Sequence, residues 1–306
     1  MTQTTYVCGW DGGGTKTQVL CLTPEGRVAG EGTFGPLNLN GAEEEKIAAT
    51  IRESVAFMAG QPGGLAGCGA LVIGTAGVSN RAAVELVTRA VRQCGYEGPL
   101  RLLGDQEIAL AGAIDGPGAV LVAGTGAICC GRDGAGNRTR VGGYGYLIDD
   151  GGSGYALGRD ILTAVVRAAD GRGPATALTQ AVFAALGVQS VGEIITWLYA
   201  PATGKKEVAA LAPLLLPALE GEDEAALGIA RAAAEELALL ACTAWQNLKL
   251  ERGELALTGS ILQRYPRIRQ GVAERCLARY PHMKIIEPRG SAAWGAARLA
   301  LAMKEE

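Results

Sequence analysis

The chain has 306 residues, of which 48% are hydrophobic and 19% are charged, and its formal net charge is -3 at pH 7. This length is typical of two domains, and the apolar content is high enough to exclude a disordered chain. The balanced charge, without Lys/Arg-rich runs, argues against nucleic acid as a partner. The sequence contains neither a long apolar run nor a recognisable secretory leader, so we expect a cytoplasmic protein with no membrane partner.

Cysteine and histidine usage limits the chemistry further. The eight cysteines are scattered, several of them inside apolar runs, and we interpret them as reduced core thiols. The single histidine, His282, lies in a Tyr-Pro-His turn. A histidine base or a multi-histidine metal site is therefore poorly supported.

The first third of the chain predicts strands that give way to alternating helices and strands. Runs of β-favouring residues end at glycine-containing turns, and apolar residues at helical spacing follow. The expected order is three strands, a helix, a strand, a helix and a strand, at residues 6–10, 17–22, 27–33, 41–59, 70–74, 81–95 and 100–103. Such alternation is typical of α/β folds.

A second cycle begins at an apolar strand over residues 119–123, which runs into Gly124-Thr125-Gly126 and continues through 128–131. Strand, glycine-containing bend with threonine, strand and turn occur in the same order as at the start of the chain, which indicates two related halves. An alanine-rich helical segment extends to residue 250. Strands at 254–257 and 284–286 and a helix at 291–303 are expected to follow.

The run Asp11-Gly12-Gly13-Gly14-Thr15-Lys16 is a candidate phosphate-binding turn. Adjacent glycines let backbone N–H groups approach an anion, and Thr15 and Lys16 add donors. Asp11 is a candidate Mg²⁺ ligand through water. The alternative is an ordinary tight hairpin with an exposed acid. The run matches neither a P-loop nor a dinucleotide-binding fingerprint.

Two later bends favour the phosphate interpretation. Gly124-Thr125-Gly126 taken alone is an ordinary strand bend, but together the two turns could hold the β- and γ-phosphates of a nucleotide from two sides of a cleft. Gly259, in Thr258-Gly259-Ser260, would let an adenosine moiety approach the backbone. Three such bends occur together in this order by chance much more rarely than a single bend does.

Four stretches together resemble the N-acetylglucosamine kinase family, within the BadF/BadG/BcrA/BcrD group of actin-like ATPases. They are residues 11–20, 124–126, the glycine-rich stretch 142–154 and 257–259, and the resemblance spans nearly the whole chain. It implies an α/β, ribonuclease-H-like (actin-like ATPase) fold of two domains with a nucleotide cleft between them. We expect one domain at 1–113, joined by the final helix 290–306, and the other at 114–289. The implied activity is ATP-dependent, Mg²⁺-assisted phosphorylation of an amino sugar.

Asp105 is the candidate catalytic base. It follows the strand at 100–103 and precedes a helix, where a carboxylate can accept the proton of a sugar hydroxyl. The alternative is a helix N-cap, a position that Asp favours. The resemblance matches Asp105 to the family's proposed base.

The resemblance also implies sugar-binding residues. Asp150 matches a ligand of a sugar hydroxyl, with Gly143 and Tyr144 beside it, although two adjacent acids before a glycine-rich turn could simply be solvated. Asn38 matches a sugar-binding asparagine, with Asn40 as the alternative register. Asparagine suits this role because it donates to one hydroxyl and accepts from another.

The sequence departs from the family pattern where specificity is decided. Ala127, Ile128 and Gly151 stand where the family often has polar residues. Because fewer polar groups reach the acceptor, the sequence leaves the identity of the sugar substrate open. The alternatives are N-acetylglucosamine, N-acetylmuramate, glucosamine and glucose.

Two other function classes fit the sequence less well. An ATPase activator of a dehydratase needs a shared iron–sulfur cluster, but Cys129 and Cys130 are adjacent in a strand and point to opposite faces. A non-catalytic sugar or nucleotide sensor is disfavoured because Asp105 is retained and no helix-turn-helix region precedes Tyr6. A homodimer is possible on general frequency, and no residue locates its interface.

Overall fold

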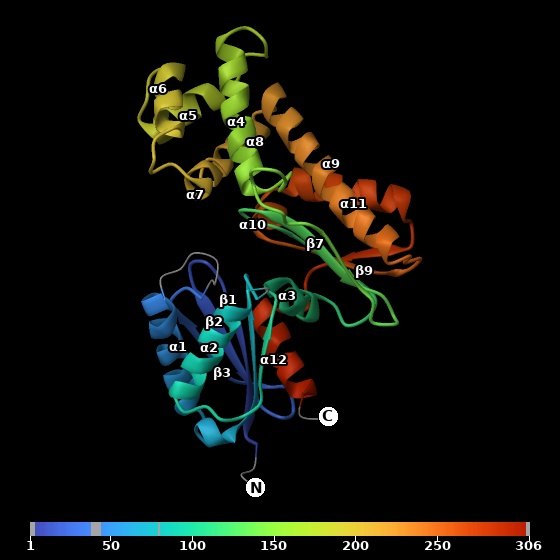
Figure 1. Cartoon of the computed structure of the whole chain (residues 1–306). Helices are drawn as coiled ribbons and strands as arrows, with labels where there is room; N and C mark the ends of the chain where they lie inside the picture. Colours follow the sequence, from blue (N-terminus) through green and yellow to red (C-terminus); the bar gives the residue numbers. More distant parts are fainter. Residues whose placement is uncertain (1–3, 38–43, 79, 304–306) are drawn as a thin grey trace. The chain divides into compact units, whose positions relative to one another are not determined.

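The computed structural model describes residues 4–37, 44–78 and 80–303. The chain divides into two compact units, one of Met1–Asp115 with Pro288–Glu306 and one of Gly116–Glu287. In Figure 1 the last helix, α12 (Ala292–Ala302, red), lies beside the blue and cyan strands of the first unit. The end of the chain therefore belongs to the same unit as its beginning.

The first unit is built on one five-stranded sheet. Its strands are β1 (Tyr6–Gly12), β2 (Thr17–Leu22), β3 (Val28–Phe34), β4 (Cys68–Thr75) and β5 (Leu100–Leu103), in the order β3-β2-β1-β4-β5. The first three strands pair antiparallel, and β4 and β5 continue parallel to β1. Helices α1 (Glu44–Ala59) and α2 (Arg81–Gln93) contribute to the core on one face, and α3 (Asp105–Ala113) and α12 to the core on the other.

Small residues let α12 approach the sheet closely. A Cβ atom at Gly9 of β1 would lie 2.1 Å from the backbone nitrogen of Ala297, and one at Gly295 would lie 2.1 Å from the carbonyl oxygen of Ile108 in α3. Both distances are far below contact distance, so only glycine fits at these two positions. The docking of α12 is therefore specified by residues from three elements.

The second unit repeats the strand arrangement. Its strands are β6 (Gly118–Ala123), β7 (Ala127–Arg132), β8 (Arg138–Gly142), β9 (Gly253–Thr258) and β10 (Met283–Ile286), in the order β10-β9-β6-β7-β8. Again three strands pair antiparallel and two continue parallel to the first. The predicted fold class, α/β with two ribonuclease-H-like halves, is confirmed.

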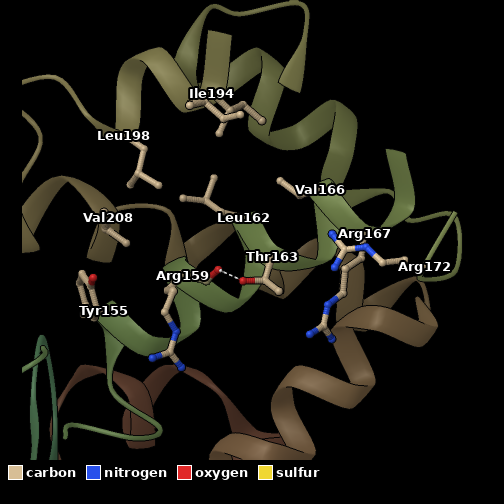
Figure 2. Close-up of a pocket in the computed structure, with 11 residues that line it drawn as sticks. Tyr155, Arg159, Leu162, Thr163, Val166, Arg167, Arg172, Ile194, Leu198 and Val208 are labelled. Carbon is tan, nitrogen blue, oxygen red and sulfur yellow. Dashed lines mark hydrogen bonds between the residues drawn. The ribbon is translucent and has the colours of Figure 1, made fainter. Parts of the chain in front are cut away.

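A helical region is inserted between β8 and β9 of the second unit. It consists of α4 (Gly154–Ala169), α5 (Leu178–Leu186), α6 (Val191–Leu198), α7 (Lys205–Ala209), α8 (Leu215–Glu220) and α9 (Glu224–Asn247); α10 (Ser260–Arg264) and α11 (Pro266–Arg279) follow β9. Helices α4 and α6 line a cavity of about 300 Å³, with Leu162 and Val166 facing Ile194 and Leu198 (Figure 2). Within the described residues no single helix has the length and apolarity to cross a membrane; only α5 and α6 taken together would pass, and they are bent by 54° at their break.

All eight cysteines are free thiols, and all except Cys94 are buried. Cys129 belongs to the main core of the second unit, whereas its neighbour Cys130 lies outside that cluster. This matches the alternation of side chains along β7.

Candidate functional site

The turn between β1 and β2 leaves donors free. The N–H group of Gly13 donates to the carbonyl oxygen of Lys16 (3.0 Å), which closes the turn. The N–H groups of Gly14 and Thr15 have no acceptor among the described residues. Gly12 has a packing reason of its own, since a Cβ there would lie 2.8 Å from the carbonyl oxygen of Leu37. Exposed, unpaired N–H groups without side chains in front of them fit a phosphate group.

The carboxylate of Asp11, at the end of β1, is partly buried. Burial, and then the negative charge of Asp105, raise the pKa of Asp11 to about 6, while Lys16 acts in the opposite direction. Like charges held together at the end of a strand would be offset by a divalent cation, and carboxylates are the ligands that Mg²⁺ prefers. Asp11 therefore fits the expected metal-binding role.

Asp105 is the first residue inside α3, and the N-cap is Gly104. The backbone N–H of Gly104 donates to the Glu107 carboxylate (3.2 Å). Among the described residues, the carboxylate of Asp105 accepts only the N–H of the next residue, Gln106 (2.9 Å). The interpretation of Asp105 as the N-cap is therefore wrong. Its exposed carboxylate is available to a substrate.

The turn between β6 and β7 resembles the first turn in its hydrogen bonding. Gly124 donates to the carbonyl oxygen of Gly126 (2.9 Å), and in the described part of the chain the N–H groups of Thr125 and Gly126 find no acceptor. Behind the turn, the first N–H group of α4, on Gly154, donates to the carbonyl oxygen of Gly124 (2.7 Å). The carbonyl side of the turn is thus anchored while donors stay free for an anion.

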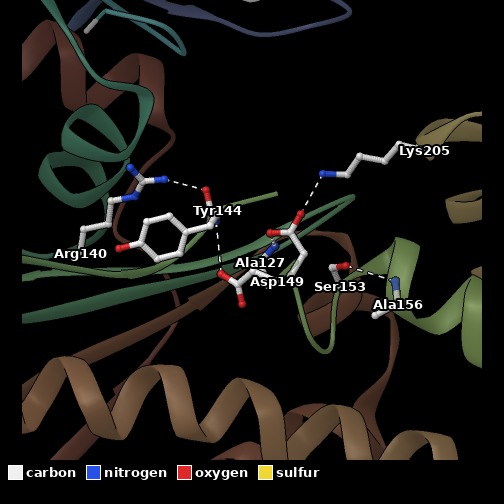
Figure 3. A network of polar contacts seen from close by, with 9 residues as sticks. Ala127, Arg140, Tyr144, Asp149, Ser153, Ala156 and Lys205 are labelled. Atoms are coloured by element: carbon white, nitrogen blue, oxygen red, sulfur yellow. Dashed lines mark hydrogen bonds and ion pairs between the residues drawn. The ribbon is translucent and has the colours of Figure 1, made fainter. Parts of the chain in front are cut away.

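Asp150 lies against this second turn and is only 3% exposed. Its Oδ1 accepts the N–H of Ala127 (3.2 Å), and its Oδ2 accepts from Nζ of Lys205 (2.9 Å), as the dashed line from Lys205 in Figure 3 shows. A Cβ at Gly126 would lie 2.9 Å from the same Oδ2, so the glycine admits the carboxylate. The alternative that Asp150 is a solvated loop acid is wrong.

The loop before Asp150 carries the other predicted sugar residues. The guanidinium of Arg140 donates to the carbonyl oxygen of Gly143 (2.6 Å) and lies over the ring of Tyr144, 5.3 Å from its centre. The N–H of Tyr144 donates to the Asp149 carboxylate (3.2 Å), and Tyr144 is 66% exposed (Figure 3). An exposed ring held by a cation on one side is a surface on which a sugar can stack.

Gly259 and Asn38 are the remaining predicted binding residues. Gly259 has φ 94°, and a Cβ there would lie 2.3 Å from the carbonyl oxygen of Ala123 in β6, so packing alone requires this glycine. Asn38 and its alternative Asn40 lie outside the described residues. Adenosine binding at Gly259 and sugar binding at Asn38 stay predictions.

Two charged residues of the helical region were not predicted from the sequence. Lys205 reaches Asp150, and the carboxylate of Glu236 in α9 lies where a side chain at position 151 would begin, 2.9 Å from a Cβ placed on Gly151. Neither residue belongs to a recognisable motif, and Lys205 is 55 positions from its partner. The only local signal was the Thr-Gly-Lys-Lys run that starts α7.

Two sheets of the same strand order, each with a glycine-containing turn after its first strand, place the protein in the class of actin-like sugar kinases and ATPases. More specifically, the chain belongs to the BadF/BadG/BcrA/BcrD ATPase family, whose model matches residues 8–300.

Similar proteins support the same assignment. An N-acetylmuramic acid/N-acetylglucosamine kinase from Clostridium acetobutylicum is 32% identical over 96% of this chain and 98% of its own length. An N-acetyl-D-glucosamine kinase from Dictyostelium discoideum is 30% identical, with 97% and 98% covered. A solved structure from Chromobacterium violaceum, provisionally named an N-acetylglucosamine kinase, has a TM-score of 0.76 and 27% identity, with 97% of this chain and 99% of that chain covered.

Proposed function

We propose that this protein transfers the γ-phosphoryl group of ATP to a hydroxyl of an amino sugar, first of all N-acetylglucosamine, with N-acetylmuramate as the alternative. Its family and its two kinase relatives support an ATP-dependent sugar kinase. The observation that carries the proposal is that each unit combines a turn with unpaired N–H groups and a carboxylate, Asp11 in one unit and Asp150 in the other.

The residues of the two turns fit a nucleotide. Gly12, Gly13, Gly14, Thr15 and Lys16 in the first unit and Gly124, Thr125 and Gly126 in the second bind phosphate groups in this proposal, and Gly259 admits adenosine. Asp11 holds Mg²⁺ through water. When bound, ATP with Mg²⁺ supplies an activated phosphoryl group whose charge is already partly neutralised.

The acceptor side of the proposal uses Asp105 and the loop before α4. Asp105 accepts the proton of the attacking hydroxyl, because its exposed carboxylate at the start of α3 is not the helix N-cap. Asp150, Gly143 and Tyr144 bind the sugar, together with Asn38. Cytoplasmic location is part of the proposal, since ATP is the donor, and the homodimer stays a prediction.

Product analysis tests the proposal. The protein is incubated with ATP-Mg²⁺ and, separately, N-acetylglucosamine, N-acetylmuramate, glucosamine, N-acetylmannosamine or glucose, and phosphate esters are identified by ³¹P NMR. We expect a sugar monoester with N-acetylglucosamine or N-acetylmuramate and little ADP without sugar. ADP formation that is equal with and without every sugar, with no ester formed, would contradict the proposal.

A further inference from the structure

Lys205 forms an ion pair with Asp150. Its Nζ lies 2.9 Å from Oδ2 of Asp150, along the dashed line that starts at Lys205 in Figure 3. The same Nζ lies 5.6 Å from the ring centre of Tyr146, and the Lys205 side chain is 30% exposed. The ammonium therefore has a carboxylate and an aromatic ring as neighbours and still reaches solvent. Such a group can change partners without crossing an apolar barrier.

The position of Lys205 relative to the second turn is fixed by packing. Lys205 begins α7, and α7 lies so close to α4 that a Cβ at Gly158 would stand 2.0 Å from the carbonyl oxygen of Val208. The beginning of α4 is in turn bonded to Gly124. Contacts therefore connect the second turn to α4, α4 to α7, and α7 through Lys205 to Asp150, which is itself bonded to Ala127 next to the turn.

The ion pair occupies the carboxylate that a sugar is proposed to use. Oδ1 of Asp150 is already bonded to Ala127, Oδ2 is bonded to Lys205, and little of the residue is exposed. A sugar hydroxyl therefore reaches Oδ2 most directly by displacing the ammonium. Because Oδ2 also lies against Gly126, a displaced ammonium is already next to the turn whose N–H groups are unpaired.

We propose that Lys205 changes partners on sugar binding: it pairs with Asp150 while the sugar site is empty, and it contacts the phosphoryl group bound at Thr125 and Gly126 once a sugar hydroxyl has taken its place. This proposal rests on the proposed function. Its consequence is that the full positive charge reaches the phosphate only when an acceptor is present. Sugar and nucleotide binding are thereby coupled, and transfer of the phosphoryl group to water is disfavoured.

The test compares Lys205→Met with Lys206→Met, which removes the same charge from the neighbouring, exposed residue. Binding of the non-hydrolysable nucleotide AMPPNP-Mg²⁺ is measured by calorimetry with and without N-acetylglucosamine or N-acetylmuramate, whichever the wild type phosphorylates. Turnover and sugar affinity are measured on the same proteins. Because loss of Lys205 leaves the buried carboxylate of Asp150 without its ion pair and can destabilise the fold, two further variants are included. They are Lys205→Gln, whose amide is able to donate a hydrogen bond, and the charge-retaining Lys205→Arg.

We expect the sugar to tighten AMPPNP binding by roughly 10-fold in the wild type and in Lys206→Met, and not in Lys205→Met or Lys205→Gln. Turnover of these two Lys205 variants should fall roughly 10- to 100-fold, with sugar affinity within about threefold of wild type, and Lys205→Arg should recover most of the turnover.

Unchanged coupling and turnover in folded Lys205→Gln would overturn the proposal. So would a variant that loses sugar affinity but keeps wild-type turnover at saturating sugar, since that result describes a purely structural ion pair. A wild type without sugar-dependent turnover would instead defeat the proposed function, and the role of Lys205 with it.

Discussion

Asp11 and Asp150 show how differently one protein can hold two carboxylates. Asp150 is buried but compensated by Lys205 and by the N–H of Ala127. Asp11 is partly buried beside the like charge of Asp105, and its pKa is raised to about 6. A partly buried carboxylate beside a like charge, in a strand that leads into a glycine-containing turn, is a common arrangement at sites that bind a cation or a proton during function.

The raised pKa of Asp11 predicts a pH-dependent stability effect. A carboxyl group with a folded pKa above its unfolded value contributes stability below about pH 4, and this contribution is lost as the pH rises through about 6. In Asp11→Asn the group cannot ionise. The variant should therefore exceed the wild type in unfolding free energy by up to about 3 kcal/mol at pH 7.5 and by much less at pH 4.

Thermal unfolding in EDTA at the two pH values measures this difference. The exposed acid Glu97, replaced by Gln, serves as the control for the loss of a surface carboxylate. If Asp11→Asn raises the unfolding free energy equally at both pH values, ionisation of Asp11 is not the cause of the increase.

At the level of elements, most strands were predictable from the sequence, whereas β8 (Arg138–Gly142) and the division of the helical insertion were not. The strands stop at glycine-containing turns, so local signals fix both ends, as at the strand that ends before Gly104. The segment between Gly154 and Asn247 is alanine-rich throughout, and its division into six α-helices depends on tertiary packing. The pairing of Lys205 with Asp150 arises from that packing. For this reason Asp150 was predicted from the sequence as a site residue, whereas its partner Lys205 was not.

Because α12 lies so close to β1, adding one methyl group at Gly9 should lower the free energy of unfolding markedly. Gly9→Ala places a Cβ 2.1 Å from the backbone of Ala297, and since backbone cannot move aside cheaply, we expect a loss of about 2–4 kcal/mol in unfolding free energy.

The matched control is Gly228→Ala in α9, where a Cβ meets nothing within 4 Å and should stabilise the helix by about 0.5–1 kcal/mol. Chemical denaturation of both variants measures the contrast. Equal effects would show that α12 does not pack against β1 as described.

At the scale of the whole molecule, the two units share one strand order and one kind of turn, and this duplication was visible in the sequence as an internal repeat. The chain passes from one compact unit to the other after Asp115 and returns at Pro288. That the two halves are separate folding domains stays a prediction. In the proposed function each unit supplies one carboxylate, the base Asp105 from one and the sugar ligand Asp150 from the other.

Steady-state ADP release from the wild type and Asp105→Asn, at saturating N-acetylglucosamine or N-acetylmuramate, decides whether Asp105 activates a sugar hydroxyl for phosphorylation by ATP. We predict sugar-dependent turnover in the wild type and a loss of roughly 100-fold or more in the variant, with sugar and nucleotide affinity retained, because only the proton acceptor has been removed. Turnover of Asp105→Asn within a few-fold of the wild type would contradict the assignment of Asp105 as the base.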